Sequence, residues 1–336
     1  MSPELSIVIV NYRSVSLILD CLETIYALTR DLRFEVIIAD NDSDEAASGQ
    51  VLAVYPGVQW IRMGYNAGFA RANNAAIRMA KGKAILLLNP DTLVEDNAIG
   101  VCYHLFEASP YVGCGVQLLN EDHTSQVTGS YFMKGGLNYL LPLPFLGSWV
   151  KALGGIFKVE RPSIPNATGV VEVDWINGAF LMVKTDVLQQ AGLLDEDFFL
   201  YAEEIEWCSR LRRQGKIAVF GELHIIHLQG VSANESFGSE GKGYYNLYDR
   251  KGLQIMISNF VRIRKQLGVF WFLVQLLFYI LEIPIFFFGM CLLRLGRRAT
   301  GRLTWRCFRG YCSNVGYVIG KSGTILRNKP YFYKVL

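Results

Sequence analysis

The stretch that decides the fold is Ala84-Ile-Leu-Leu-Leu-Asn-Pro-Asp91, a continuous apolar run that ends in polar residues. Such a run is typical of a strand buried on both faces, as in a parallel sheet covered by helices. Two similar runs precede it, at residues 5–10 and 34–39, and segments with helical spacing of apolar residues lie between them, at 15–29 and 69–80. The alternation predicts an α/β fold in which a parallel sheet carries helices on both faces.

Polar residues directly follow each of the three predicted strands. They are Asn11 and Tyr12 after the first strand, Asp40 and Asp42 after the second, and Asn89 and Asp91 after the third. Ligands of such sheets bind beyond the carboxyl ends of the strands, where carboxylates can bond a ribose or hold Mg²⁺ or Mn²⁺ together with phosphate oxygens. Asp and Asn also terminate strands simply as turn residues, so the clusters alone leave both interpretations open.

A second group of acidic residues lies in Phe198-Phe-Leu-Tyr-Ala-Glu-Glu-Ile-Glu-Trp207. Apolar spacing predicts a helix over 203–214, which Gly215 can end. One of its carboxylates, if it faces a pocket, could act as a general base, although acidic residues also favour a helix N-terminus because of the helix dipole. His224 and His227 follow the next predicted strand, and composition does not decide whether either is structural or a ligand.

Charge divides the chain into an acidic body and a basic C-terminal part. Residues 251–336 hold 14 Lys and Arg against one acidic residue, Glu282, for a net charge of +13, and residues 1–250 hold 19 against 29, for −10. The asymmetry suggests a polyanionic partner for the basic part, either nucleic acid or an anionic membrane surface. Because the basic residues are interleaved with a long apolar run, lipid fits better than nucleic acid.

The apolar run covers residues 269–293, which would form a helix of about 37 Å, long enough for a tilted crossing of a bilayer core. Basic residues flank both ends, and the positive-inside rule would place both flanks in the cytoplasm, which one crossing cannot do. With Pro284 as a kink, a monotopic or re-entrant arrangement is favoured, while a single span and a buried soluble helix stay open. The apolar stretch 137–150, within the Pro- and Gly-rich region 125–170, either faces the bilayer or packs on the protein.

Composition excludes several other classes of protein. With 51% hydrophobic and 19% charged residues, the chain is not intrinsically disordered. Its seven cysteines include no Cys-x-x-Cys pair, so we expect reduced thiols in a cytosolic setting rather than a disulfide framework or a zinc site. The N-terminus lacks a basic segment before its short apolar run, which is typical of a buried strand rather than a signal peptide.

In their order along residues 5–235, the motifs together resemble family 2 glycosyltransferases, and most of all rhamnosyltransferase-type enzymes of bacterial surface polysaccharide synthesis. The motifs are Ser-Ile-Val-Ile-Val-Asn-Tyr12, Asp40-Asn-x-Ser43, Asn66-x-Gly-Phe-Ala-x-Ala-Asn-Asn74, Leu-Leu-Leu-Asn-Pro-Asp91, Trp175-x-x-Gly-Ala179, Leu-Asp-Glu-Asp-Phe-Phe-Leu-Tyr201, Glu203-Glu204, Gly215, and His227 followed by Ser232. The resemblance implies a GT-A domain over 1–235, with 125–170 as an irregular, partly apolar insertion. A basic, apolar, helical membrane-associating region over 236–336 would follow.

The resemblance also implies roles for individual residues. Glu204 matches the catalytic base, next to Glu203, where the family carries a Glu-Asp pair. Asp91 and His227 would bind Mg²⁺ or Mn²⁺, with Asn89 at the first position of the family's Asp-x-Asp motif; His224 does not match and is expected to be structural. The nucleotide-sugar pocket would comprise Asn11, Tyr12, Asp40, Asp42, Asn66, Asn74, Asn89 and Asp91, and the acceptor side would comprise Trp175 and Gly178.

The implied function is inverting, metal-dependent transfer of a sugar, with rhamnose expected, from a nucleotide-sugar to a hydroxyl of a lipid-linked glycan. It would take place on the cytoplasmic face of the inner membrane, with the protein peripheral or monotopic, no nucleic-acid partner, and an oligomer compatible with the sequence. A sugar nucleotidyltransferase is a weaker alternative, because residues 10–20 lack the glycines of a phosphate loop. A non-catalytic scaffold is the other alternative, against which the set Asp91, Glu204 and His227 argues.

Overall fold

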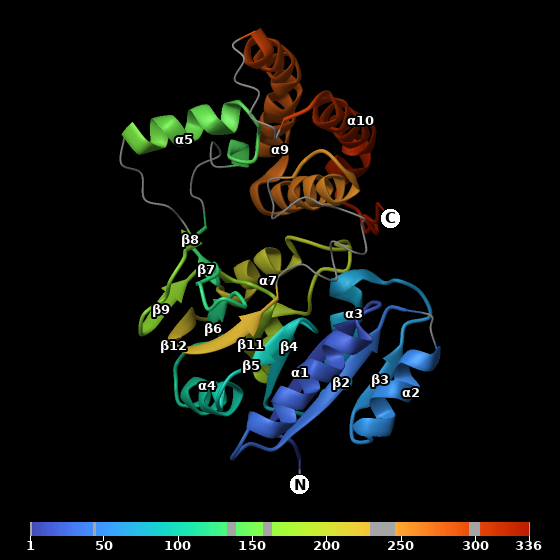
Figure 1. Ribbon diagram of the computed structural model, residues 1–336, viewed down its shortest axis with the longest axis vertical. Coiled ribbons are helices and arrows are strands. Elements are labelled where there is room, and N and C mark those ends of the chain that lie inside the picture. Colours follow the sequence, from blue (N-terminus) through green and yellow to red (C-terminus); the bar gives the residue numbers. More distant parts are fainter. Residues whose placement is uncertain are drawn as a thin grey trace. The chain divides into compact units, whose positions relative to one another are not determined.

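The computed structural model describes residues 2–42, 45–132, 139–156, 163–228, 246–295 and 303–335 (Figure 1). The chain forms two compact units. Unit 1 comprises Met1–Phe132, Pro162–Phe199 and Glu203–Ser232, and unit 2 comprises Met133–Arg161, Leu200–Ala202 and Ala233–Leu336. The apolar stretch that the sequence places in an insertion of the first domain therefore belongs, by its packing, with the C-terminal residues.

Unit 1 is built on a nine-stranded sheet whose first four neighbours are parallel, in the order β3-β2-β1-β4. These strands are β1 (Leu5–Asn11), β2 (Phe34–Asp40), β3 (Gln59–Arg62) and β4 (Ala84–Leu88). The three strands predicted from apolar runs are all present. Residues 84–88 are buried throughout, as the run of Leu and Ile requires of a strand covered on both faces.

The parallel arrangement predicted from the first three strands is confirmed up to β4 and does not extend beyond it. There the strands are β11 (Phe180–Lys184), β6 (Gly113–Leu119), β12 (Ile217–His227), β5 (Thr92–Val94) and β9 (Val170–Val173). β11 runs antiparallel to both β4 and β6, β6 is parallel to β12, and β5 and β9 are antiparallel to β12. A continuous apolar run reports burial on both faces, and an antiparallel strand under two layers of helices needs the same residues.

Helices cover both faces of this sheet, as predicted (Figure 1). One core cluster contains side chains of α1 (Val15–Leu28), α2 (Glu45–Val54) and α4 (Ala98–Glu107), and the other contains side chains of α3 (Gly68–Ile77), α6 (Leu188–Ala191) and α7 (Glu203–Leu211). A short turn, η2 (Thr185–Val187), precedes α6, and a small second sheet joins β10 (Trp175–Ile176), β7 (Gly129–Ser130) and β8 (Ser163–Ile164). All seven cysteines are free thiols, and burial raises the pKa of Cys21 and of Cys208 to about 12, so these two stay protonated.

Unit 2 contains α5 (Leu146–Ile156), α9 (Arg250–Leu295) and α10 (Trp305–Arg327). α9 is broken at Gly268, whose φ of 86° and ψ of −171° are not helical, so the sharp break lies there, while Pro284 lies inside the second helical part. Among the described residues, one helix is long and apolar enough to cross a membrane: Arg250–Leu293, with a mean hydropathy of 2.3 in its most apolar window. Only 22% of that window is buried.

Glu282, the acidic residue that interrupts the apolar run, has a structural role inside unit 2. Its side chain is fully buried and accepts hydrogen bonds from the backbone N–H groups of Phe145, at 2.7 Å, and Leu146, at 3.1 Å. These are the first donors of α5, which lack partners within the helix, so Glu282 caps α5 from α9. The Phe145 ring packs on Phe286, with ring centroids 5.6 Å apart. The segment predicted as irregular thus contains a helix that is fixed to α9.

Candidate active site

The ends of β1 and β2 hold Asp40 rigidly at the carboxyl edge of the sheet. Asn11 and Asp40 are register partners, and Asp40 is 2% exposed. Its Oδ1 accepts from Asn11 Nδ2 at 2.7 Å and from the backbone N–H of Asp42 at 3.0 Å, and its Oδ2 accepts from Trp60 Nε1 at 3.3 Å. The predicted pair Asn11 and Asp40 is therefore brought together, and Trp60, which no sequence motif marked, supports it from β3.

Asn41 connects this edge to the loop that carries Asn66. Its Nδ2 donates to Gly68 O at 2.9 Å, and its Oδ1 accepts from Ala67 N at 3.1 Å. Gly68 has a φ of +74°, and a Cβ there would collide with the carbonyl oxygen and ring of Phe199. Only glycine allows this approach, which places the loop against the segment that leads to α7.

Asn74 lies on α3 with its amide bonded within the protein. It donates to Leu194 O at 2.8 Å and to Glu196 Oε1 at 3.0 Å, and it accepts from Leu194 N at 3.0 Å. These bonds fix the segment that runs toward the acidic helix α7. A direct role of Asn74, like those of Tyr12, Asp42 and Asn66, in nucleotide binding stays a prediction.

Asp91 and His227 meet where β5 pairs with β12. Asp91 Oδ1 lies 3.5 Å from His227 Nε2, and the two side chains are 2% and 7% exposed. Asn89 Nδ2 lies 3.4 Å from the same Nε2. The backbone adds a bond from Leu228 N to Asp91 O at 2.9 Å. Three predicted site residues from two distant stretches of the sequence thus form one cluster, in which Asp91 and His227 are buried.

Gln126 determines which nitrogen of His227 carries the proton. Its Nε2 donates to His227 O at 2.6 Å and to Asn120 Oδ1 at 2.8 Å, so its Oε1 must face His227 Nδ1, at 2.9 Å. An amide oxygen only accepts, hence Nδ1 carries the proton and the neutral ring leaves a lone pair on Nε2. Sequence analysis missed Gln126, which precedes His227 by 101 positions and belongs to no motif.

The cluster fits a divalent cation. Asp91 Oδ1 is buried and has no hydrogen-bond donor within the described part of the chain, and 3.5 Å to Nε2 is too long for a hydrogen bond. Lone pairs on Asp91 Oδ1 and His227 Nε2 face the same place, and the Gln126 amide fixes the orientation of the His227 ring. This arrangement is typical of a metal site. The described residues contain no group of three or more His, Cys, Asp or Glu that could hold a metal, so the other ligands would be water or substrate oxygens.

His224 does not share this cluster. It lies three residues before His227 in the regular part of β12, and an odd separation along a strand directs the two side chains to opposite faces of the sheet. The side chain of His224 therefore faces away from the Asp91–His227 cluster, and its structural role stays a prediction.

The acidic residues at the start of α7 are all buried. Glu203, Glu204 and Glu206 are 3%, 7% and 8% exposed. Glu206 forms a bidentate ion pair with Arg210, with the shortest N–O distance at 2.7 Å, so this carboxylate is held by an arginine of its own helix. Tyr201 and Ala202, directly before the helix, both have left-handed φ values, 73° and 70°. Strain of about 1–3 kcal/mol per such residue is typical of functional sites.

The predicted acceptor residues lie beside this helix. A Cβ on Gly178 would lie 3.5 Å from the Phe69 ring and 3.7 Å from Glu204 Cβ, so Gly178 and Glu204 are neighbours with room between them for about one methyl group. Trp175 is held in β10 by pairing with Ser130 of β7. The structure therefore brings Gly178 and Glu204 together, while the acceptor role of Trp175 stays a prediction.

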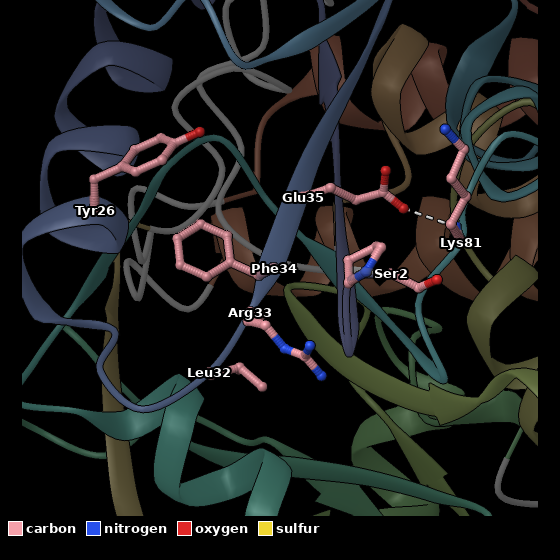
Figure 2. Close-up of a pocket in the computed structure, with 8 residues that line it drawn as sticks. Ser2, Tyr26, Leu32, Arg33, Phe34, Glu35 and Lys81 are labelled. Atoms are coloured by element: carbon pink, nitrogen blue, oxygen red, sulfur yellow. Dashed lines mark hydrogen bonds between the residues drawn. The ribbon is translucent and has the colours of Figure 1, made fainter.

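An open hollow of about 870 Å³ lies on the opposite edge of the sheet, at the amino ends of β1 and β2 (Figure 2). Its lining is Ser2, Pro3, Tyr26, Leu32, Arg33, Phe34, Glu35 and Lys81. The Glu35 carboxylate already accepts from Ser6 Oγ at 2.6 Å, Lys81 N at 2.7 Å and Gln59 Nε2 at 2.7 Å. Arg33 is paired with Glu4 at 3.1 Å. Because Glu35 and Arg33 already have partners and ligands of such sheets bind at the carboxyl ends, this hollow is not the candidate site.

Comparison with known proteins gives the chain its relatives. Residues 6–146 match the family described as Glycosyl transferase family 2. The chain is 28% identical over 256 residues to the low-salt glycan biosynthesis hexosyltransferase Agl10 of Haloferax volcanii (74% of this chain, 75% of that protein). It is 26% identical over 230 residues to the rhamnosyltransferase WbbL of Escherichia coli K12 (66% and 82%). It is 24% identical over 210 residues to the N-acetylglucosaminyl-diphospho-decaprenol L-rhamnosyltransferase of Mycobacterium tuberculosis (58% and 66%).

Two solved structures share the fold. One is the mannosyltransferase PcManGT from Pyrobaculum calidifontis in complex with GDP-Man and Mn²⁺, with a TM-score of 0.51, 12% identity, and 95% of this chain and 87% of that chain covered. The other is GalNAc-T7 with UDP, GalNAc and Mn²⁺, with a TM-score of 0.51 and 13% identity over 79% of this chain; the match spans 50% of that longer chain. At these identities the likeness shows the GT-A fold and nothing further.

Proposed function

Since this chain is a glycosyltransferase with a family 2 domain and the GT-A fold, we propose that it transfers a sugar, rhamnose, from a nucleotide-sugar to a hydroxyl of a lipid-linked glycan, with inversion at the anomeric carbon. The observation that carries the proposal is the Asp91–His227 cluster, in which Nε2 and Oδ1 present two buried lone pairs 3.5 Å apart. The names of two relatives, a rhamnosyltransferase and a rhamnosyltransferase of a decaprenol-linked sugar, support the choice of donor and acceptor.

On the donor side, Asp91 and His227 would hold Mg²⁺ or Mn²⁺, next to the amide of Asn89. When bound, such an ion neutralises the charge that develops on the departing diphosphate. Asp40, fixed by Asn11 and Trp60, offers a carboxylate for hydrogen bonds to the nucleoside. Because these groups are preorganised by buried bonds, little reorganisation is needed as the leaving group departs.

On the acceptor side, Glu204 removes the proton from the attacking hydroxyl. The new bond forms between the acceptor oxygen and the anomeric carbon, while the bond from that carbon to the diphosphate breaks on the opposite face. The proton moves to the Glu204 carboxylate, and the electron pair leaves with the nucleotide diphosphate. One displacement inverts the configuration and needs no enzyme nucleophile. The carboxylate of Glu203, the residue directly before Glu204 on α7, would support Glu204 in this role.

The exposed face of α9 supports a membrane surface as partner. After Gly268, the buried positions of α9 include Phe272, Gln275, Tyr279 and Glu282, so its polar side chains face the protein. Among the described side chains of this part of α9, the large exposed ones are apolar, including Phe270, Leu273, Leu277, Phe288 and Leu292, which are between 48% and 69% exposed. α10 adds exposed basic residues, Arg306, Arg309 and Arg327. An apolar face beside basic groups suits a helix lying in an anionic interface, so the protein would be peripheral or monotopic on the cytoplasmic side of the inner membrane.

Replacing Leu273, Leu277 and Phe288 together with Gln is expected to lower binding to phosphatidylglycerol vesicles at least tenfold. Each apolar side chain of this size contributes about 1.5–3 kcal/mol when it leaves water. Vesicle flotation of the full-length protein measures the effect. The matched control replaces three exposed apolar residues of unit 1, Val54, Val101 and Leu105, and should float like the wild type. Equal flotation of both triple variants would contradict the proposed face.

Donor binding by the purified protein tests the proposed transfer most directly. Uridine, thymidine and guanosine nucleotide-sugars would be titrated with and without Mn²⁺ or Mg²⁺. We expect one donor, a thymidine nucleotide of rhamnose, to bind at least tenfold more tightly with the metal, because Asp91 and His227 would hold a cation that neutralises charge on the diphosphate. Metal-independent binding of that donor would contradict the assigned metal site, and preference for another sugar would contradict rhamnose as the donor.

A further inference from the structure

The first part of α9 carries a buried polar stripe in an otherwise apolar environment. Gln254, Ser258 and Arg262 follow one another at intervals of four residues, so they share one face of the helix. The three residues are 0%, 1% and 5% exposed, respectively. Buried polar groups are expected to find hydrogen-bond partners, so each can be checked in turn.

Two of the three side chains are satisfied within unit 2. Gln254 Nε2 donates to Ser258 Oγ at 3.1 Å and to Tyr333 O at 3.0 Å, and its Oε1 accepts from Val335 N at 3.1 Å. Ser258 Oγ donates to Leu200 O at 2.7 Å. Their role is to fasten α9 to the C-terminal residues and to the turn at Leu200.

Arg262 is the exception. Its guanidinium donates one hydrogen bond, from Nη1 to Gln266 Oε1 at 3.2 Å, and it lies over the ring of Tyr139, 5.1 Å from the ring centroid. Nε is buried and has no acceptor in the part of the chain that the structure describes. Across the described residues, no carboxylate forms an ion pair with it. The sequence supplies no acidic residue between positions 250 and 281, and Arg264 and Lys265 follow directly.

A permanently charged guanidinium with five donors rarely stays buried without an anion, because desolvation of the charge is not compensated. The described contacts use one donor and the face of the ring, which leaves the planar edge for an acceptor. Phosphate is the anion whose geometry matches this edge, through two parallel N–H···O bonds. Tyr139, which covers the face, does not compete for those bonds.

We propose that Arg262 is the anion-binding residue of a subsite for a lipid-borne phosphate, either the diphosphate of the lipid-linked acceptor or a phospholipid headgroup. The inference rests on the proposed function for the identity of the acceptor, and a relative whose name includes a sugar-diphospho-decaprenol shows that such acceptors occur among similar enzymes. Arg262 lies in the helical part of α9 before the break at Gly268, and the exposed apolar face begins just beyond it, so the two consecutive parts of α9 offer contacts for the phosphate and for the lipid chain.

The test uses the full-length protein in detergent with EDTA, so that the Asp91–His227 cluster cannot recruit a diphosphate through a metal. Binding of farnesyl diphosphate is measured by calorimetry, with farnesol as the phosphate-free probe, and binding to phosphatidylglycerol vesicles is measured by flotation. Arg262→Gln should bind one of the two phosphate probes at least tenfold more weakly, and Arg262→Lys should retain part of the affinity. Arg30→Gln makes the same charge change at an exposed site of unit 1, outside the proposed membrane face, and should bind both probes like the wild type.

The pattern identifies the source of the phosphate. A loss confined to farnesyl diphosphate assigns the acceptor's diphosphate, and a loss confined to vesicles assigns the headgroup. Unchanged affinity of Arg262→Gln for both probes, or no binding of either probe by the wild type, overturns the subsite.

Stability gives a second readout: Arg262→Met should unfold at the same temperature or higher, since an apolar side chain replaces an uncompensated charge. A fall of several degrees with unaltered probe binding would show a purely structural arginine. The donor titration with Mn²⁺ tests residues of unit 1, so its outcome is independent of the Arg262 result and tests the proposed function separately.

Discussion

Asp91→Asn is expected to reduce sugar transfer by roughly 10²–10³-fold, with metal-dependent donor binding lost in parallel. The substitution keeps the shape of the side chain but removes its charge and one of its two acceptor oxygens. In the native cluster, Oδ1 has no donor among the described residues and faces the His227 Nε2 lone pair at 3.5 Å. The amide of an Asn at position 91 could donate a hydrogen bond to His227 Nε2. That bond would occupy the nitrogen lone pair, so the two side chains could no longer bind a cation together.

The readouts for this variant are the transfer rate and donor affinity at increasing Mn²⁺. Asp186→Asn is the control, because Asp186 is an exposed carboxylate on unit 1 at the turn before α6. Wild-type donor affinity and metal dependence in Asp91→Asn would remove Asp91 from the metal site. Loss of affinity in both variants would indicate a general electrostatic effect rather than a specific ligand.

Glu204→Gln is expected to lower kcat by about 10²–10⁴-fold while the KM for the donor changes little. A general base contributes an effect of this size, and the amide cannot accept the proton of the acceptor hydroxyl. Glu204 is 7% exposed and lies at the N-terminus of α7, next to Gly178. Steady-state kinetics with the matched donor measure the loss.

Glu206→Gln is a matched control on the same helix. It makes the same change to a buried carboxylate two residues further on, but Glu206 is paired with Arg210 at 2.7 Å, so the expected loss is in thermal stability and not in kcat. A Glu204→Gln enzyme with an unaffected rate would refute the assigned base. If Glu203→Gln then abolished the rate, the base would be the neighbouring carboxylate.

The parts of the site that could be predicted from the sequence are those that depend on short-range pattern. Apolar runs marked β1, β2 and β4, and the polar residues at their ends lie at one edge because parallel strands share a direction. The pairing of Asn11 with Asp40 follows from that register.

Other features depend on long-range pairing, for which a single sequence carries no periodic pattern. Gln126 reaches His227 through a bond at 2.9 Å, although 101 positions separate them. The antiparallel entry of β11 beside β4 was missed because burial on both faces selects the same apolar residues in either direction. The surroundings of Arg262 are likewise not visible in the sequence: its described contacts are Tyr139 and Gln266, which no local motif connects with it.

The cap that Glu282 forms on α5 affects how this protein can be divided for study. A fragment that stops near residue 235 retains α5 but loses the carboxylate that holds Phe145 N and Leu146 N, together with the Phe286 ring on which Phe145 packs. Such a fragment would expose the newly uncovered apolar side chains of residues 139–156 and tend to self-associate, whatever the state of its sheet. Limited proteolysis should accordingly release α5 together with α9 rather than with unit 1. Truncation is therefore a poor way to locate the membrane anchor, and point substitutions on the outer face of α9 keep the cap in place.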